Sequence, residues 1–215
     1  MKKIFSIALL LAAGVSMVSA QTSFYNTPHI GIRASYDHTF PTDLKIGGES
    51  IDAYNSGPGF SIGAMYNIPV AENIYFEPGL SIFYNTYKDS YITFDSPMQQ
   101  RKREVTISKF GFRAPLTFGY RIPLFDNGGL NVFTGPQFDY GVKAKWRLDF
   151  DGLDTNLYSN ANDMNRFDIA WRIGAGVYYG QWVAELSTAF GMLDMDSSSL
   201  SYHENRFSIS VGYFF

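Results

Sequence analysis

Regular alternation of polar and apolar residues is the feature that most constrains how this chain can fold. In "RFSISVGYFF", at 206–215, every second side chain is apolar, from Phe207 through Ile209 and Val211 to Phe215. The stretch "RFDIAWRIGAGVYYG", at 166–180, follows the same rule. Because successive side chains of a β-strand point to opposite faces, a period of two predicts strands with one apolar face and one polar face.

Period two recurs throughout the chain after Gln21, and no segment there shows a convincing helical period. Eight stretches are predicted as strands: 29–40, 59–68, 74–88, 105–122, 130–148, 166–179, 182–193 and 205–215. The connections near 69–73, 123–129 and 180–181 are short, whereas those near 41–58, 89–104, 149–165 and 194–204 are long and polar. Short turns at one end and long loops at the other are typical of outer-membrane barrels. We therefore predict an eight-stranded antiparallel up-and-down transmembrane β-barrel, closed by pairing of the last strand with the first.

Alternation alone would also fit a soluble sheet whose apolar face packs inward. Two features favour the membrane interpretation. The strands run ten residues or more, which is the length a tilted strand needs to span a bilayer. The apolar face is also aromatic at both ends of the strands, as interfacial girdles are. These aromatic residues are Tyr66, Phe118, Tyr120, Tyr179, Trp182, Tyr213 and Phe215 near the short turns, and Tyr36, Tyr84, Trp146 and Phe167 near the long loops.

The amino terminus has the composition of an export signal. "MKKIFSIALLLAAGVSMVSAQ" combines Lys2 and Lys3 with an apolar run and a small-residue site before Gln21. This pattern predicts a signal peptide over 1–20 that is cleaved after Ala20, leaving a barrel domain over 21–215 in the bacterial outer membrane. The chain contains no cysteine, so neither disulfides nor a lipidated cysteine are expected, and its net charge of −3 gives no indication of nucleic-acid binding.

The polar face carries enough charge to form a network inside the barrel. Eight strands enclose a lumen just wide enough for side chains to fill, so we expect a polar plug of ion pairs, with an ion path as the alternative. The alternation also slips near Ser108–Lys109, which predicts a β-bulge there or a strand that rises above the membrane. The residues assigned to the interior are Arg33, Glu77, Arg113, Arg121, Asp139, Lys143, Lys145, Arg147, Asp168, Arg172 and Glu185.

Candidate catalytic residues are few. Closure would bring His38 and Asp37 near His203 and Glu204 at the outer rim, where a His–carboxylate cluster could act on lipid. No motif surrounds these four residues, so ordinary rim residues are the favoured interpretation. His29 has no evident partner. The acidic loop with Asp149, Asp151, Asp154 and Asp163 lacks an EF-hand spacing, and neither a metal nor a cofactor is predicted.

Several segments resemble the PorT-type outer-membrane β-barrel family. They are "YFEPGLSIFYNTY", "RAPLTFGYRI", "VFTGPQFDYGV" and "RIGAGVYYGQWVAELSTAFGML", patterns of Gly, Pro and aromatic residues that suit a narrow barrel. The resemblance implies this architecture and, through the family's namesake, a part in protein export by a dedicated secretion system. It supplies no catalytic motif.

Four functions follow from these observations, in order of preference. The first is a non-enzymatic envelope protein with extracellular loops as its binding surface, and the second is a component of protein secretion. A lipid-modifying enzyme using the rim histidines and a small-solute channel come third and fourth. The expected partners are outer-membrane lipid and lipopolysaccharide, and a protein bound at the long loops. The basic run Arg101–Arg103 could meet acidic lipopolysaccharide headgroups, but a solvated loop is the favoured interpretation.

Overall fold

The computed structural model describes residues 24–42, 44–46, 49–51, 55–96, 99–148, 154–158, 165–195 and 202–215. Strands dominate these residues, and the one short 3₁₀ helix among them, η2 (Phe24–Asn26), precedes the first strand. No helix in the described part of the chain is long and apolar enough to cross a membrane. The strands are β1 (His29–Pro41), β2 (Leu44–Ile46), β3 (Glu49–Ile51), β4 (Gly57–Pro69), β5 (Ile74–Ser96), β6 (Gln99–Phe125), β7 (Gly128–Leu148), β8 (Asp154–Asn156), β9 (Phe167–Tyr179), β10 (Trp182–Gly191) and β11 (Glu204–Phe214).

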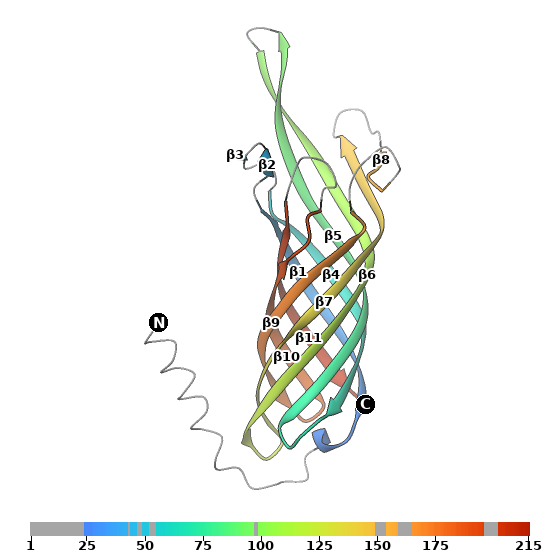
Figure 1. The fold of residues 1–215 in the computed structure, drawn as a ribbon, viewed down its shortest axis with the longest axis vertical. Coiled ribbons are helices and arrows are strands. Elements are labelled where there is room, and N and C mark those ends of the chain that lie inside the picture. Colours follow the sequence, from blue (N-terminus) through green and yellow to red (C-terminus); the bar gives the residue numbers. More distant parts are fainter. Residues whose placement is uncertain are drawn as a thin grey trace, which may run out of the picture.

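Eight of these strands close into a barrel (Figure 1). Their order around the barrel is β1, β4, β5, β6, β7, β9, β10 and β11, and every neighbouring pair is antiparallel. The last strand pairs with the first, with Tyr36 opposite Ile209. This pairing closes the sheet and leaves no edge strand in the barrel wall. The predicted eight-stranded up-and-down barrel is therefore confirmed.

The two ends of the barrel differ in their connections. At one end the strands are joined at 70–73, 126–127 and 180–181. Gly180 has a φ of +55°, which a two-residue hairpin turn requires and which glycine adopts without strain. The long connections all lie at the opposite end, where β2 and β3 form a small hairpin and β8 pairs with the end of β7. The predicted sorting of short and long connections is thus observed.

The connection predicted near 89–104 is mostly strand. The pairing of β5 with β6 continues from Asp89 opposite Val105 to Ser96 opposite Gln99, and the two strands rise as a ribbon above the barrel mouth (Figure 1). We call this segment, residues 89–105, the β5–β6 ribbon. The prediction ended these strands too early because polar side chains there broke the apolar alternation, although backbone pairing does not need an apolar face.

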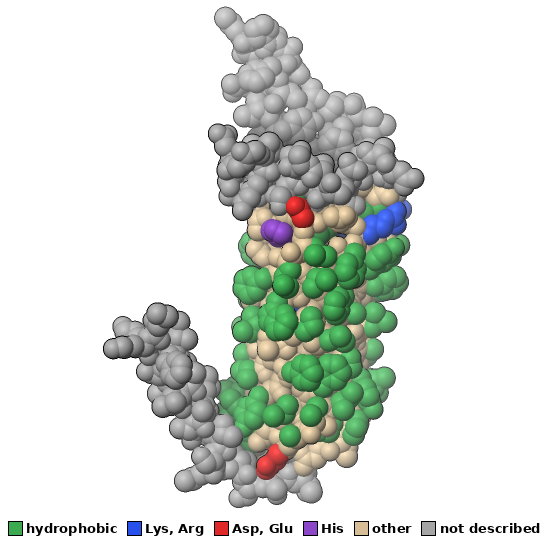
Figure 2. All heavy atoms as spheres, viewed as in Figure 1, with side chains coloured by type: hydrophobic (Ala, Val, Ile, Leu, Met, Phe, Trp, Pro, Cys, Tyr) green, Lys and Arg blue, Asp and Glu red, His purple; other side chains and the backbone are tan. Residues whose placement is uncertain are grey.

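The barrel is apolar outside and polar inside. Trp182, Leu186 and Ile209 lie on the outer wall with about half or more of each side chain exposed, while Arg113, Asp139 and Glu185 are buried within. Figure 2 shows apolar side chains over most of the visible face of the barrel wall. A soluble sheet would have the opposite arrangement, so the outer wall is built for contact with lipid.

Of the two predicted causes of the slip near Ser108–Lys109, the structure shows the extended strand on β6, and a bulge occurs on the neighbouring strand β7 instead. On β6 the inward side chains continue without a slip through Ile107, Lys109 and Gly111, and β6 simply extends above the barrel. The register shifts between Phe110 and Gly111, which pair with Lys143 and Gly141, so Val142 of β7 is the extra residue of a bulge.

This bulge corrects part of the predicted interior. Beyond Val142 the phase of β7 reverses, and Ala144 becomes the inward residue, with 0% of its surface exposed. Lys143, Lys145 and Arg147 therefore point outward, contrary to the prediction, since one inserted residue moves every following side chain to the other face.

Candidate functional site

The interior charges form three groups along the barrel axis. Nearest the short turns, Arg33 of β1 contacts two carboxylates: its Nη2 lies 2.7 Å from Glu77 Oε1 and 3.0 Å from Glu185 Oε2. Amides complete this group, because Asn67 Nδ2 donates to Glu77 at 3.2 Å and Asn131 Nδ2 donates to Glu185 at 2.9 Å. Strands on opposite sides of the lumen are thus linked through one guanidinium.

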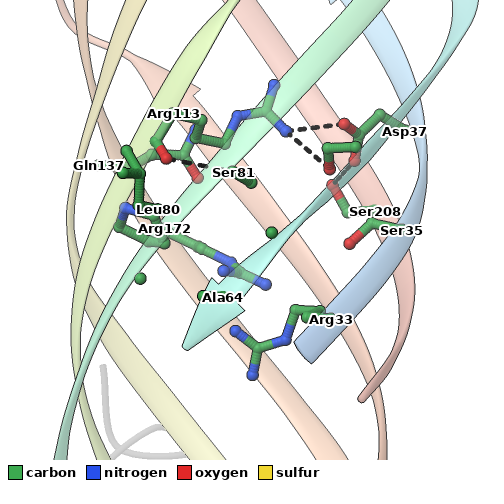
Figure 3. A pocket seen from close by; sticks show the side chains of 14 residues that line it. Arg33, Ser35, Asp37, Ala64, Leu80, Ser81, Arg113, Gln137, Arg172 and Ser208 are labelled. Atoms are coloured by element: carbon green, nitrogen blue, oxygen red, sulfur yellow. Dashed lines mark hydrogen bonds and ion pairs between the residues drawn. The ribbon is translucent and has the colours of Figure 1, made fainter. Parts of the chain in front are cut away.

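The second group centres on Arg113 of β6 (Figure 3). Its Nη1 lies 2.7 Å from Asp37 Oδ2, and its Nε lies 3.2 Å from Asp139 Oδ2. Ser208 donates to Asp37 at 2.7 Å, and Arg206 Nη1 contacts Asp139 Oδ2 at 2.9 Å. Buried carboxylates need such compensation, because an isolated charge away from water is costly.

The third group lies nearest the long connections. The ammonium of Lys109 contacts Glu204, and the hydroxyl of Tyr87 donates to the same carboxylate oxygen at 3.0 Å. All three side chains are buried. The upper mouth of the barrel is therefore held by a pair joining β6 to β11, on opposite sides of the lumen.

Of the eleven predicted interior residues, three are buried without an ion pair among the described residues: Arg121, Arg172 and Asp168. Arg172 donates from Nε to Ser187 Oγ at 3.2 Å, and its guanidinium lies 5.0 Å from the centre of the Phe133 ring. Asp168 lies opposite Asp139 in the β9–β7 register, and its Oδ1 accepts no hydrogen bond from the described residues. Five others, Arg33, Glu77, Arg113, Asp139 and Glu185, participate in the ion pairs above.

Sequence reasoning missed Lys109 and Arg206 as network members and assigned Asp37 and Glu204 to the rim. The inward phase of their strands could have identified them, because Arg206 shares a face with Ser208 and Ser210, and Lys109 with Arg113. The carboxylate that each cation contacts could not be predicted from the sequence, because the partners are far apart in the chain. Arg206 and Asp139, for example, are separated by 67 residues.

A small cavity lies within the network of described residues. The cavity beside Arg33, Asp37, Arg113 and Arg172 measures about 30 Å³. A single water needs roughly 10–15 Å³ by the same measure, so this space suits one or two buried waters rather than a file of hydrated ions. Figure 3 shows the guanidinium groups of Arg33, Arg113 and Arg172 projecting into it.

The four rim candidates do not form one cluster. Asp37 and Glu204 point into the barrel and hold Arg113 and Lys109. His38 lies on the opposite face of β1, where its Nε2 is 3.1 Å from Ser56 Oγ and its ring packs against Phe40. His203 donates from Nδ1 to the carbonyl of Leu193 at 2.8 Å. Alternation along β1 separates His38 from Asp37, because neighbouring residues of a strand face opposite ways.

His29, for which no partner was evident in the sequence, has two. Its Nδ1 donates to a backbone oxygen of Phe215 at 2.8 Å, and its Nε2 accepts from Thr27 Oγ1 at 2.9 Å. These contacts tie the beginning of β1 to the end of β11 at the point where the barrel closes, a pairing that only the tertiary fold creates.

The described residues contain no group of three or more His, Asp or Glu side chains that could hold a metal ion. The acidic loop residues Asp149, Asp151 and Asp163 lie outside the described residues, and of Asp154 only the backbone is described. The side chains of Arg101, Lys102 and Arg103 are likewise outside the described part, although their backbone belongs to β6.

A protein-family model described as "Outer membrane protein beta-barrel domain" matches residues 19–197, most of the chain. This chain belongs to that family. The protein is accordingly an integral barrel of the bacterial outer membrane, with its apolar band in the bilayer. No curated protein matches it.

Among solved structures, this outer-membrane barrel is similar to Ail of Yersinia pestis in complex with a heparin analogue, at 15% identity and a TM-score of 0.42 over 88% of this chain and 99% of that one. Neisserial surface protein A matches at 13% identity and a TM-score of 0.43 over 86% of this chain and 97% of that one. LpxR of Salmonella typhimurium matches at 10% identity and a TM-score of 0.33 over 87% and 100%.

Membership of the family orients the barrel. Outer-membrane barrels have short periplasmic turns and longer extracellular loops, so the ends of β9 and β10 at 180–181 face the periplasm and the β5–β6 ribbon faces the exterior.

The periplasmic mouth of the barrel is closed by a side chain from the segment before β1. Tyr25 of η2 is buried, with its ring centre 5.1 Å from that of Tyr178 and 5.8 Å from that of Phe214, both edge-on. The guanidinium of Arg121, predicted to be an interior charge, lies 4.1 Å from the ring centres of both Tyr25 and Tyr75. Burial of the Tyr25 hydroxyl raises its pKa well above the usual value, so the side chain is neutral at physiological pH.

Replacing Tyr25 with alanine should lower the free energy of unfolding by about 2 kcal/mol, because two edge-on aromatic contacts and one face of the Arg121 cation–π pair are lost. The measurement is a urea titration of the purified barrel in detergent micelles, followed by tryptophan fluorescence. Val70→Ala, at an exposed position in a neighbouring turn, is the control. Equal unfolding midpoints for both variants would show that Tyr25 does not stabilise the periplasmic mouth.

Proposed function

We propose that this outer-membrane barrel is a non-enzymatic interaction protein, whose filled lumen serves stability and whose extracellular strands contact a partner. The proposal rests on one combination of features. Paired charges occupy the lumen, and the β5–β6 ribbon extends beyond it. A solute path would need open space along the axis, and among the described residues the interior cavity of about 30 Å³ does not offer it.

The β5–β6 ribbon is the extracellular feature best suited to binding. Within the described residues, Tyr91, Thr93 and Phe94 pair only with β6, so the far edge of β5 presents backbone donors and acceptors. Unpaired strand edges accept an additional extended segment through main-chain hydrogen bonds. The partner we propose is therefore a protein or peptide that adds a strand to this ribbon.

The geometry supports this function over lipid modification. General acid–base catalysis by a histidine requires its ring to lie within hydrogen-bond distance of the carboxylates that assist it. Here the two rim carboxylates are engaged by Arg113 and Lys109 inside the lumen, and His38 faces outward. The resemblance to the PorT-type family adds that the partner belongs to a protein-export system, and this is part of the same proposal.

The test is photocrosslinking in intact cells. A photoreactive residue at Tyr91 in the ribbon should give discrete protein adducts, identified by mass spectrometry, and the same residue at Asn127 in a periplasmic turn should not give those adducts. Adducts to lipid alone from Tyr91 would contradict the interaction proposal. Lipid A that is altered by the wild-type protein but not by His38→Ala or His203→Ala would support the enzymatic alternative instead.

A further inference from the structure

Four cations lie together on the outer wall of the barrel, where most of the other described outward side chains are apolar. Lys88 of β5 and Lys143 and Arg147 of β7 are exposed, and Lys145 is partly exposed. Figure 2 shows Lys and Arg side chains at the upper border of the apolar band. We call Lys88, Lys143, Lys145 and Arg147 the outer basic patch.

The strand register brings these residues side by side across β5, β6 and β7. Lys88 pairs with Thr106, which pairs with Arg147; Ser108 pairs with Lys145. Tyr84 and Phe110 form the row nearer the membrane, beside Lys143. Cations and hydroxyls thus lie directly above aromatic rings, and this is the order in which an outer-leaflet lipid presents its headgroup and its acyl chains.

The patch surrounds a hollow of about 430 Å³. Its lining consists of Tyr84, Phe110, two hydroxyls and the three β7 cations, with no carboxylate among them. In the β7–β8 pairing the backbone of Asp154 lies opposite that of Arg147. An anion with several phosphate oxygens matches this lining, because ammonium and guanidinium groups are strong phosphate donors.

The Val142 bulge is what creates the patch. Without the extra residue Lys143, Lys145 and Arg147 would share the inward face with Asp139, and the lumen would receive three further charges. The bulge turns them out at the level of the extracellular interface, and bulges at barrel rims commonly redirect side chains in this way.

We propose that the outer basic patch binds the phosphorylated glucosamine headgroup of lipid A, the anionic lipid of the outer leaflet, with the acyl chains lying against Tyr84 and Phe110. The ligand is recognised by its phosphates and held by its tails. The site is therefore a lipid site on the barrel wall, separate from the ribbon that carries the proposed protein interaction.

The test compares lipid A binding by the wild-type barrel and by the triple variant Lys143→Gln, Lys145→Gln, Arg147→Gln, each in phosphatidylcholine nanodiscs containing bisphosphorylated lipid A. At about fivefold in affinity per charge, the loss of three charges should weaken binding by about 100-fold. The control Lys143→Arg, Lys145→Arg keeps the charge and should bind as the wild type does. Native mass spectrometry of the extracted complexes reports bound lipid, and the band of the unheated protein on a denaturing gel reports folding.

Three outcomes would overturn the proposal. One is equal lipid A binding by the folded triple variant and the wild type. Another is equal binding of dephosphorylated and bisphosphorylated lipid A by the wild type, which would show that the apolar wall alone holds the lipid. The third is displacement of lipid A by inorganic pyrophosphate, which would identify a site for soluble phosphates rather than for an outer-leaflet lipid.

Discussion

Replacing Arg113 with alanine should lower the free energy of unfolding of the barrel by about 3–5 kcal/mol, the usual loss when one partner of a buried ion pair is removed. Arg113 contacts Asp37 at 2.7 Å and Asp139 at 3.2 Å. Asp139 keeps Arg206, but Asp37, with 0% of its surface exposed, would lose its ion-pair contact and retain the Ser208 hydroxyl as a hydrogen-bond donor among the described residues. A buried carboxylate without a cation in contact is the main cause of the expected loss.

The measurement is the urea midpoint of the purified barrel in lipid vesicles, read from the heat-modifiable band. A double variant, Arg113→Gln with Asp37→Asn, removes both charges and should be less destabilised than the sum of the two single variants. Arg113→Lys preserves the charge and should lie between wild type and alanine. If Arg113→Ala unfolds at the wild-type urea concentration, the network does not stabilise the barrel.

Replacing Leu186 with arginine should destabilise the barrel by about 2–4 kcal/mol, the cost of a cation on the lipid face at the bilayer midplane. Leu186 lies near the middle of β10 and is 54% exposed. In a soluble protein such an exposed position would accept arginine with little change. The large effect is therefore a direct consequence of the lipid around the wall.

Tyr179→Arg provides the matched control. Tyr179 is 66% exposed and ends β9 beside the periplasmic turn, where an arginine reaches the interface and should cost about 0–1 kcal/mol. Both variants are compared by urea titration in the same vesicles. Equal destabilisation at the two depths would contradict the assignment of the apolar band to the membrane interior.

Much of the fold was predictable from particular strands. β9 and β10 alternate without interruption, and their predicted bounds, 166–179 and 182–193, lie within two residues of the observed Phe167–Tyr179 and Trp182–Gly191. Here one face meets lipid and the other meets the lumen, so the hydrophobic pattern reports the strand directly. The inward assignment of Arg33, Glu77, Arg113, Asp139 and Glu185 followed from the same phase.

The prediction failed where the strand structure of the backbone does not follow the hydrophobic pattern. In the β5–β6 ribbon the strands continue beyond the apolar band, since hydrogen bonds between two strands need no membrane around them. At Val142 one extra residue reverses the phase of β7, and nothing in the local sequence marks it. Lys143, Lys145 and Arg147 therefore moved from the predicted lumen to the outer wall.

By itself, the sequence determined that this protein forms a closed barrel of alternating strands, with an apolar wall, a polar lumen and its short turns at one end. Those properties depend on the period of two and on loop length, both of which are local. Only the tertiary structure decided which charges meet: Arg113 with Asp37, Arg206 with Asp139, and Lys109 with Glu204. It also decided that Tyr25 closes the periplasmic mouth and that the β7 cations lie on the outer wall. These contacts join residues far apart in the chain, and their partners are set by the register and curvature of the closed sheet, which no local pattern encodes.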